Sequence, residues 1–336
     1  MAFPPEVGPV SARGGESVLN PTGRVLLFAA FTPTGPFHMS LHQASGRWRL
    51  GLLLALVTAA CWATLPVALK LTLEQLDPYT LTWFRFVLAA GVMGAWLGAR
   101  GGLGGFRVLD GKRWWLLGLA GLGLIGNYVF YLLGVQYTTP ANAQLLIQLA
   151  PLLMALGGIV VFGERFNGWQ WAGLAVIVAG LGLFFREQVG GDAGGGDYVF
   201  GSALVVVAAI VWAGYALLQK QLLLRLPSPA ILLAIYVLAS VLLLPLAAPA
   251  ALLRLDGLHW LLLRYCALNT LVAYGAFAEA LAHWEASRVS AVLATTPLLC
   301  LGAVAAVHAL WPQVIAPERV GVVGYAGAAL VVVGSA

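Results

Sequence analysis

Apolar residues fill the chain after Leu50 in long runs, separated by short polar breaks. A helix rises about 1.5 Å per residue, so about 20 apolar residues cross the hydrocarbon core of a bilayer. The connections between runs are short, and sequential helices are therefore expected to be antiparallel neighbours. The pattern predicts ten membrane-spanning helices, at residues 50–70, 79–98, 115–135, 140–162, 169–186, 199–219, 229–248, 261–282, 287–310 and 319–335.

One apolar run, from Ala143 to Glu164, has a proline at its centre. Pro151 has no N–H and crowds the carbonyl four residues before it, so the helix is expected to bend there. Gln144 and Gln148 lie four residues apart on one face of this helix. An amide is costly against lipid, so both side chains are expected to point inward, toward protein or water.

The same arrangement returns around Pro297, because Pro-Leu-Leu occurs at 151–153 and again at 297–299. Trp62 and Trp212 match at an offset of 150, as do the lysines at the ends of the same helices, and Tyr128 and Tyr274 match at 146. The chain is therefore predicted to be a duplication. Each unit would hold five spans, and an odd number inverts the second unit relative to the first. The predicted fold class is an all-α polytopic membrane protein of two inverted five-helix repeats, at residues 50–186 and 199–335.

Composition supports a membrane protein, because 61% of residues are apolar and only 9% are charged. A soluble domain carries about 25% charged residues. The net charge of +5 does not predict nucleic-acid binding, since no cluster of basic residues forms a polar face. Cys61, Cys266 and Cys300 fall within apolar runs without metal-type spacing, and no metal or other cofactor is predicted.

Residues 1–46 are rich in Pro, Gly and Ser and are predicted to be a disordered cytoplasmic extension, or the result of start-site choice with Met39 as the first residue. Residues 187–198 are glycine-rich and predict a linker between the repeats. Lysine and arginine are twice as frequent in the loops on the side of the amino terminus as on the other side. This excess predicts a cell (inner) membrane protein with both termini in the cytoplasm.

Several of these features together resemble a known family. Arg85-Phe86 lies early in the second helix, Gly163-Glu164 ends the proline-centred fourth helix, and the fifth helix has spaced glycines. Residues 50–335 resemble the EamA-type branch of the drug/metabolite transporter superfamily. The resemblance implies a ten-helix inner-membrane carrier of small organic metabolites, often an exporter. Its cavity would be built from helices one to four and six to nine, with helices five and ten packing outside.

The second unit departs from this pattern. Ala309-Leu310 stands where the first unit has Gly163-Glu164, and the next acidic residue is Glu318. The gate at the outer end is therefore expected to differ from the family pattern.

Ionisable residues within membrane spans are candidates for substrate contact. Glu279 could bind a cationic group or carry a proton, or it could reach the cytoplasmic interface near His283 or pair with Arg85 or Arg288. Arg85 could clamp a substrate carboxylate through two hydrogen bonds. It could also extend to the interface or hold a helix carbonyl.

Lys70 and Lys220 lie at the ends of their helices, and extension of the ammonium group to the interface is the favoured reading for both. Thr295 and Thr296 precede Pro297, and the favoured interpretation is that they bond the carbonyls that this proline frees.

Aromatic and amide side chains form a second group of candidates. Tyr and Trp offer an aromatic face to apolar or cationic ligands and one polar tip. Packing between helices is the alternative for each of them. The predicted cavity-lining residues are Trp62, Tyr128, Tyr131, Gln144, Gln148, Trp212, Tyr215, Tyr236 and Tyr274.

The pattern predicts a carrier that works by alternating access, with Pro151 and Pro297 as bend points. No phosphate-binding loop is present, so a carrier would use an ion gradient such as protons, or substrate exchange. The alternative class is an intramembrane enzyme acting on a lipid-linked substrate, but nucleophile, metal and paired-carboxylate motifs are missing from the sequence. The expected partners are a small-molecule substrate, the lipid bilayer and, through glycine-lined helices five and ten, a second copy of the chain.

Overall fold

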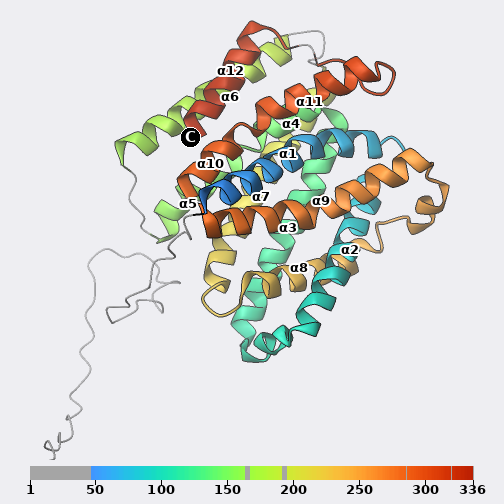
Figure 1. Cartoon of the computed structure of the whole chain (residues 1–336), viewed down its shortest axis with the longest axis vertical. Helices are drawn as coiled ribbons and strands as arrows, with labels where there is room; N and C mark the ends of the chain where they lie inside the picture. The colour runs from blue at the N-terminus through green and yellow to red at the C-terminus, as the bar shows by residue number, and fades with distance from the viewer. Residues whose placement is uncertain (1–46, 163–166, 191–194, 285, 319, 336) are drawn as a thin grey trace, which may run out of the picture. The chain divides into compact units, whose positions relative to one another are not determined.

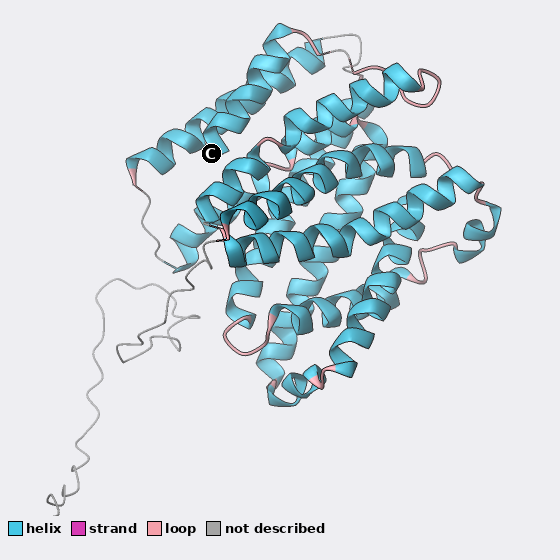
Figure 2. Cartoon of the chain, in the orientation of Figure 1, coloured by secondary structure: helices cyan, strands magenta, loops and turns pink. Residues whose placement is uncertain are grey.

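The computed structural model describes residues 47–162, 167–190, 195–284, 286–318 and 320–335. Within these ranges the regular structure is helical and contains no strand (Figures 1 and 2). The α-helices are α1 (Trp48–Thr72), α2 (Pro78–Ala99), α3 (Gly111–Tyr137), α4 (Pro140–Leu146), α5 (Leu149–Phe162), α6 (Gly168–Gly190), α7 (Gly196–Leu222), α8 (Ser228–Leu243), α9 (Gly257–His283), α10 (Ala286–Ala294), α11 (Thr296–Leu310) and α12 (Val322–Ser335). Two short 3-10 helices, Gly102–Val108 and Pro249–Arg254, lie in connections.

Eight helical segments in these ranges are long and apolar enough to cross a membrane, with α4 and α5 counted as one segment and α10 and α11 as another. The apolar helices α8 and α12 are shorter, with 16 and 14 residues. The predicted all-helical membrane class is therefore confirmed, whereas ten full spans remain a prediction.

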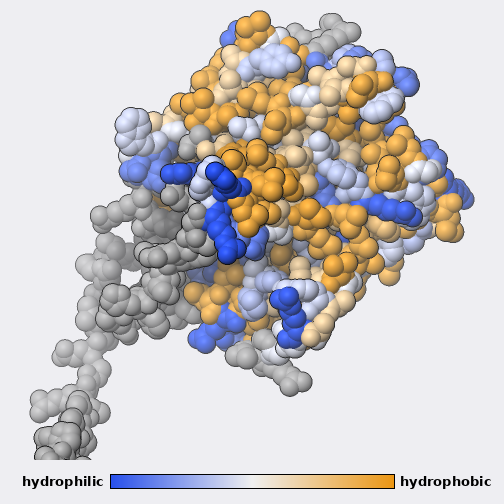
Figure 3. Space-filling view, viewed as in Figure 1, coloured by the Kyte–Doolittle hydropathy of each residue, from blue (hydrophilic) through white to orange (hydrophobic). Residues whose placement is uncertain are grey.

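The outward surface fits this class. Val160, Leu253 and Val322 are 84%, 87% and 86% exposed. Figure 3 shows apolar residues over much of the visible face. Such large apolar surfaces are rare on soluble monomers and are compatible with contact to lipid.

Some of the predicted features cannot be compared with the structure. Residues 1–46 and Gly163-Glu164 lie outside the described residues. Helix α6 continues to Gly190 and α7 begins at Gly196, so both ends of the segment predicted as a linker, 187–198, are helical.

The interruption predicted near Pro151 is present. Helix α4 ends at Leu146 and α5 begins at Leu149. The carbonyl of Ile147, which Pro151 cannot serve, accepts a hydrogen bond from Ala150 N at 2.9 Å instead. The proline therefore produces a short tight turn between two helices rather than a smooth bend.

The second proline helix is interrupted at Thr295, between α10 and α11. The Thr296 hydroxyl donates to the carbonyl of Leu293, four residues before Pro297, and the Thr295 hydroxyl donates to Val292 O at 2.6 Å. The predicted role is confirmed for Thr296, which bonds the carbonyl that Pro297 frees. Thr295 bonds a carbonyl that already accepts a backbone N–H, its own, at 3.2 Å.

The two repeats pack through reciprocal helix pairs. Helix α1 of the first repeat lies against α9 of the second, and α3 of the first lies against α7 of the second (Figure 1). Helix α2 pairs with α8, and α6 with α12. These paired helices run in opposite directions.

Helices α6 and α12 approach most closely at glycines. A Cβ atom placed on Gly180 would lie 2.6 Å from Gly327 O, and one on Gly173 would lie 2.8 Å from Gly334 O. The carboxylate of Glu187 then accepts a hydrogen bond from Gly324 N at 2.7 Å, near the start of α12. The glycine faces that suggested a homodimer contact are thus occupied within the chain.

Candidate functional site

Arg85 lies in α2 with only 3% of its surface exposed. Its Nε and Nη2 atoms donate to the hydroxyl of Thr270 on α9, at 3.2 and 3.0 Å. The Thr270 hydroxyl in turn donates to the carbonyl of Cys266 at 3.1 Å. The Arg85 side chain therefore points into the helix bundle. It does not extend to the membrane interface, as one of the alternatives from the sequence had it.

Four tyrosines surround this guanidinium. The Arg85 Cζ atom lies 4.9 Å from the ring centroid of Tyr128. The charge of Arg85 also acts on the hydroxyls of Tyr131, Tyr236 and Tyr274. The tyrosines come from α3, α8 and α9, so both repeats contribute to this tyrosine cluster around Arg85.

Further predicted residues connect to the tyrosine cluster. Trp62 on α1 packs edge-on against Tyr274 at a centroid distance of 5.7 Å. The Tyr131 hydroxyl donates to Gln144 Oε1 at 3.3 Å. Tyr215 interacts electrostatically with Tyr128, and Trp212 packs 6.4 Å from Tyr215. The structure therefore brings together Arg85, Trp62, Tyr128, Tyr131, Gln144, Trp212, Tyr215, Tyr236 and Tyr274.

The arrangement has the chemistry of an anion site. A guanidinium carries five N–H donors and stays charged at any physiological pH. Among the described residues, no carboxylate oxygen lies within 4 Å of Arg85. A buried positive charge without an acidic partner is costly unless an anion or water joins it. The tyrosine faces beside it suit an apolar or aromatic group on the same ligand.

Two predicted site residues lie elsewhere. The Glu279 side chain is 61% exposed, and its carboxylate lies 3.1 Å from His283 Nε2. Glu279 follows Tyr274 by five positions, which rotates it by about 140° around α9, away from the tyrosine cluster. Gln148 is half-buried in the break between α4 and α5. Pro151 is exposed and Pro297 is buried, each beside its helix interruption.

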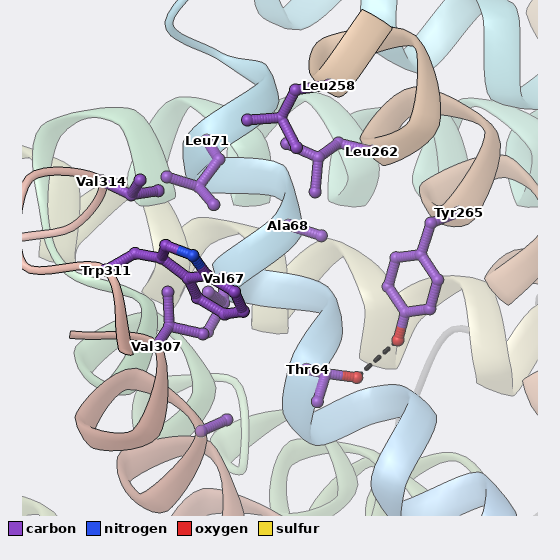
Figure 4. A pocket seen from close by; sticks show the side chains of 11 residues that line it. Thr64, Val67, Ala68, Leu71, Leu258, Leu262, Tyr265, Val307, Trp311 and Val314 are labelled. Atoms are coloured by element: carbon purple, nitrogen blue, oxygen red, sulfur yellow. Dashed lines mark hydrogen bonds between the residues drawn. The ribbon is translucent and has the colours of Figure 1, made fainter. Parts of the chain in front are cut away.

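A separate pocket of about 430 Å³ lies between α1, α9 and the end of α11 (Figure 4). Leucine and valine side chains form most of its wall. Its polar side-chain atoms are the hydroxyls of Thr64 and Tyr265, which share a hydrogen bond, and the indole nitrogen of Trp311. None of the residues that touch Arg85 lines this pocket. Polar groups converge at Arg85 instead, and we place the candidate site there. Among the described residues, no three His, Cys, Asp or Glu side chains are grouped to hold a metal ion.

Sequence reasoning missed Thr270 and the partners of Lys70. Thr270 lies four positions before Tyr274, hence on the same face of α9, and this spacing could have revealed it. Lys70 lies at the end of α1, and its position relative to the membrane interface stays a prediction. Its ammonium donates to the carbonyls of Val135, Gln136 and Thr138 at 2.7 to 2.8 Å.

A family model described as the EamA-like transporter family matches residues 49–186 and 199–336, which are the two predicted repeats. The chain belongs to this family. The predicted resemblance is confirmed, and membership of the EamA-like transporter family favours a membrane transporter over an enzyme.

Curated relatives agree with this assignment. The chain is 39% identical, over 85% of its length and 90% of the relative's, to the "Uncharacterized inner membrane transporter YhbE" of Escherichia coli (strain K12). It is 30% identical, over 48% of its length and 54% of the relative's, to the "Aromatic amino acid exporter YddG" of Ancylobacter novellus. It is 24% identical, over 84% of its length and 92% of the relative's, to a "Probable amino-acid metabolite efflux pump" of Escherichia coli (strain K12). These EamA-like relatives support a multi-pass protein of the inner membrane.

Proposed function

We propose that this protein exports a small organic metabolite that carries a carboxylate, such as an amino acid or a derivative. The substrate carboxylate binds the Arg85 guanidinium, and the remainder of the substrate lies against the tyrosine cluster. Arg85 carries this proposal, because it is buried, charged and without an acidic partner among the described residues. A buried guanidinium holds a carboxylate strongly through paired charge-assisted hydrogen bonds.

Two relatives give independent support for the substrate class. One is named as an aromatic amino acid exporter and another as an amino-acid metabolite efflux pump. An aromatic or apolar amino acid joins one carboxylate to a side chain that packs well on tyrosine. That chemistry corresponds to the surroundings of Arg85.

The transport mechanism is alternating access between two inverted repeats. In support, a carboxamide on the third helix of each repeat bonds a carbonyl on the first helix of the other repeat. Asn127 donates to Ala208 O at 3.0 Å, and Asn269 donates to Cys61 O at 2.8 Å. Reciprocal contacts of this kind are expected for two units related by a two-fold axis in the membrane plane, and rocking of such units exposes a midplane site to each side in turn.

The function is tested by comparing metabolites released by cells that overproduce the wild type with those released by cells carrying an empty vector. We expect one class of carboxylate-bearing compounds to accumulate outside the wild-type cells. Glu279→Gln at matched membrane levels should give the same profile, because the Glu279 carboxylate lies away from Arg85. Accumulation of only cationic or neutral compounds would contradict the role of Arg85, and a wild-type profile equal to the vector would contradict export.

The helix interruptions provide a second test. Alanine in place of Pro151 or Pro297 restores an N–H that can bond the carbonyl four residues back and straighten the helix. We expect each variant to transport more slowly, because the rocking motion uses these breaks as bend points. Initial transport rates at equal amounts of protein measure this effect. Transport at the wild-type rate in both variants would contradict the bend-point hypothesis.

A further inference from the structure

The turn between α3 and α4 is held from two sides by charged residues from elsewhere in the chain. On one side, the Lys70 ammonium at the end of α1 donates to the last carbonyls of α3 and of the turn, those of Val135, Gln136 and Thr138. These carbonyls have few partners within the helix, and they carry the negative end of its dipole. A lysine in this position ties α1 to the end of α3.

On the other side, Glu318 reaches the turn from the loop between α11 and α12. Its Oε1 atom accepts a hydrogen bond from Ala141 N at 2.9 Å, and the hydroxyl of Thr139 bonds the same carboxylate. The Thr139 hydroxyl also accepts from Asn142 N at 3.2 Å, closing the first turn of α4. Glu318 therefore joins the second repeat to the first at this turn.

The groups that face Glu318 come from three further elements. Lys70 from α1 attracts the carboxylate, and Tyr198 from α7 and Cys300 from α11 interact with it electrostatically. The buried Tyr198 hydroxyl and Asn142 Oδ1 have no hydrogen-bond partner among the described residues. Buried polar groups without partners are costly, and hydration on opening would relieve that cost.

We propose that Lys70 and Glu318 form a proton-sensitive latch on the α3–α4 turn, which stays closed while Glu318 is protonated and opens more readily when that proton is lost. The two residues act by positioning α4 and do not contact the substrate. The latch rests on the proposed alternating access for its role in transport, because opening of this end would be one half of that cycle.

The direction of the pH effect follows from the surroundings of Glu318. Burial raises the pKa of its carboxyl to about 7, against the ordinary 4.5, although the bonds from Ala141 and Thr139 and the charge of Lys70 oppose this rise. Opening returns water to the carboxyl and brings its pKa back toward the ordinary value. The closed form therefore binds the proton more tightly, and a rise in pH through about 7 favours the open form.

The latch is tested by amide hydrogen exchange of the full-length protein in lipid nanodiscs, followed by mass spectrometry of peptides that contain residues 139–146. Rates are divided by the known pH dependence of chemical exchange, so that the protection factor reports the opening equilibrium. Between pH 6 and pH 8 the protonated fraction of a carboxyl with a pKa of about 7 falls from about nine-tenths to about one-tenth. We therefore expect protection of this segment to fall by about tenfold.

Glu318→Gln is neutral at every pH and keeps an acceptor for Ala141 N. It should hold the segment equally protected at pH 6 and pH 8. Glu279→Gln, the same change at an acid that bonds His283 on α9 and touches neither latch residue, is the matched control and should behave as the wild type.

The pH dependence of amide protection in the wild type tests the latch even if Glu318→Gln fails to fold. No change in the protection of residues 139–146 between pH 6 and pH 8 would overturn the latch, as would an equal change in Glu318→Gln. Because exchange needs no substrate, a pH-dependent latch in a protein without export activity would count against the proposed function alone.

Discussion

Replacement of Arg85 by glutamine should lower transport of the carboxylate-bearing substrate by about 30-fold to 1,000-fold. Removing one member of a buried charge pair costs about 2–4 kcal/mol, and each 1.4 kcal/mol is a tenfold change in binding. Arg85→Lys keeps the positive charge but loses the planar pair of donors, so an intermediate rate is expected. The measurement is the initial rate of uptake into inverted membrane vesicles that contain equal amounts of protein.

The fold should survive this replacement, because Thr270 keeps its bond to Cys266 O when the guanidinium is removed. Arg264→Gln is the matched control. Arg264 lies on the exposed side of α9, with its Cζ atom 5.4 Å from the ring centroid of Trp260, and its loss should leave transport unchanged. If Arg85→Gln and Arg264→Gln transport at the same rate, Arg85 does not hold the substrate.

Hydropathy predicted where the helices lie better than where they end. Residues 229–248 were predicted as one span, yet α8 ends at Leu243. Pro245 accounts for this end, because it has no N–H to bond the carbonyl of Val241 four residues back, although Leu244 before it keeps helical backbone angles. Helix α12 begins at Val322 rather than at residue 319, and Glu187 bonds the backbone N–H of Gly321 and Gly324 there. The end of α8 follows from a local rule that the sequence contains. The start of α12 depends instead on a residue more than 130 positions away in the chain.

The candidate site likewise contains residues that the sequence could locate and contacts that it could not. Arg85 and the aromatic residues were predictable because polar groups are costly in lipid and must face protein or water. The position of Glu279 was also within reach, since counting around α9 separates it from Tyr274. The contact between Arg85 and Thr270 joins α2 to α9, and the contacts of Lys70 and Glu318 join three separate elements. Hydrophobic periodicity carries no information on such pairings, because it fixes which face is buried but not against what.

Replacement of Gly180 by alanine is expected to lower the stability of the fold. An alanine Cβ at this position would lie 2.6 Å from Gly327 O and 2.8 Å from Val331 N, both backbone atoms that cannot rotate away. Glycine allows the backbones of α6 and α12 to lie close together, and with alanine the two helices would have to separate along their whole contact. Overpacking of this kind costs about 1–3 kcal/mol, so the apparent melting temperature in detergent should fall by roughly 2–10 °C.

The matched control for Gly180→Ala is Gly182→Ala on the same helix. A Cβ atom on Gly182 meets nothing within 4 Å, so the steric cost is absent. Alanine also favours the helix more than glycine, by about 1 kcal/mol, and this variant should be as stable as the wild type or slightly more stable. Equal melting temperatures for the two variants would mean that α6 and α12 do not pack through Gly180 and Gly327. In that case the glycine face of α6 would be available to a second copy of the chain, because the contact with α12 that covers it here would not form.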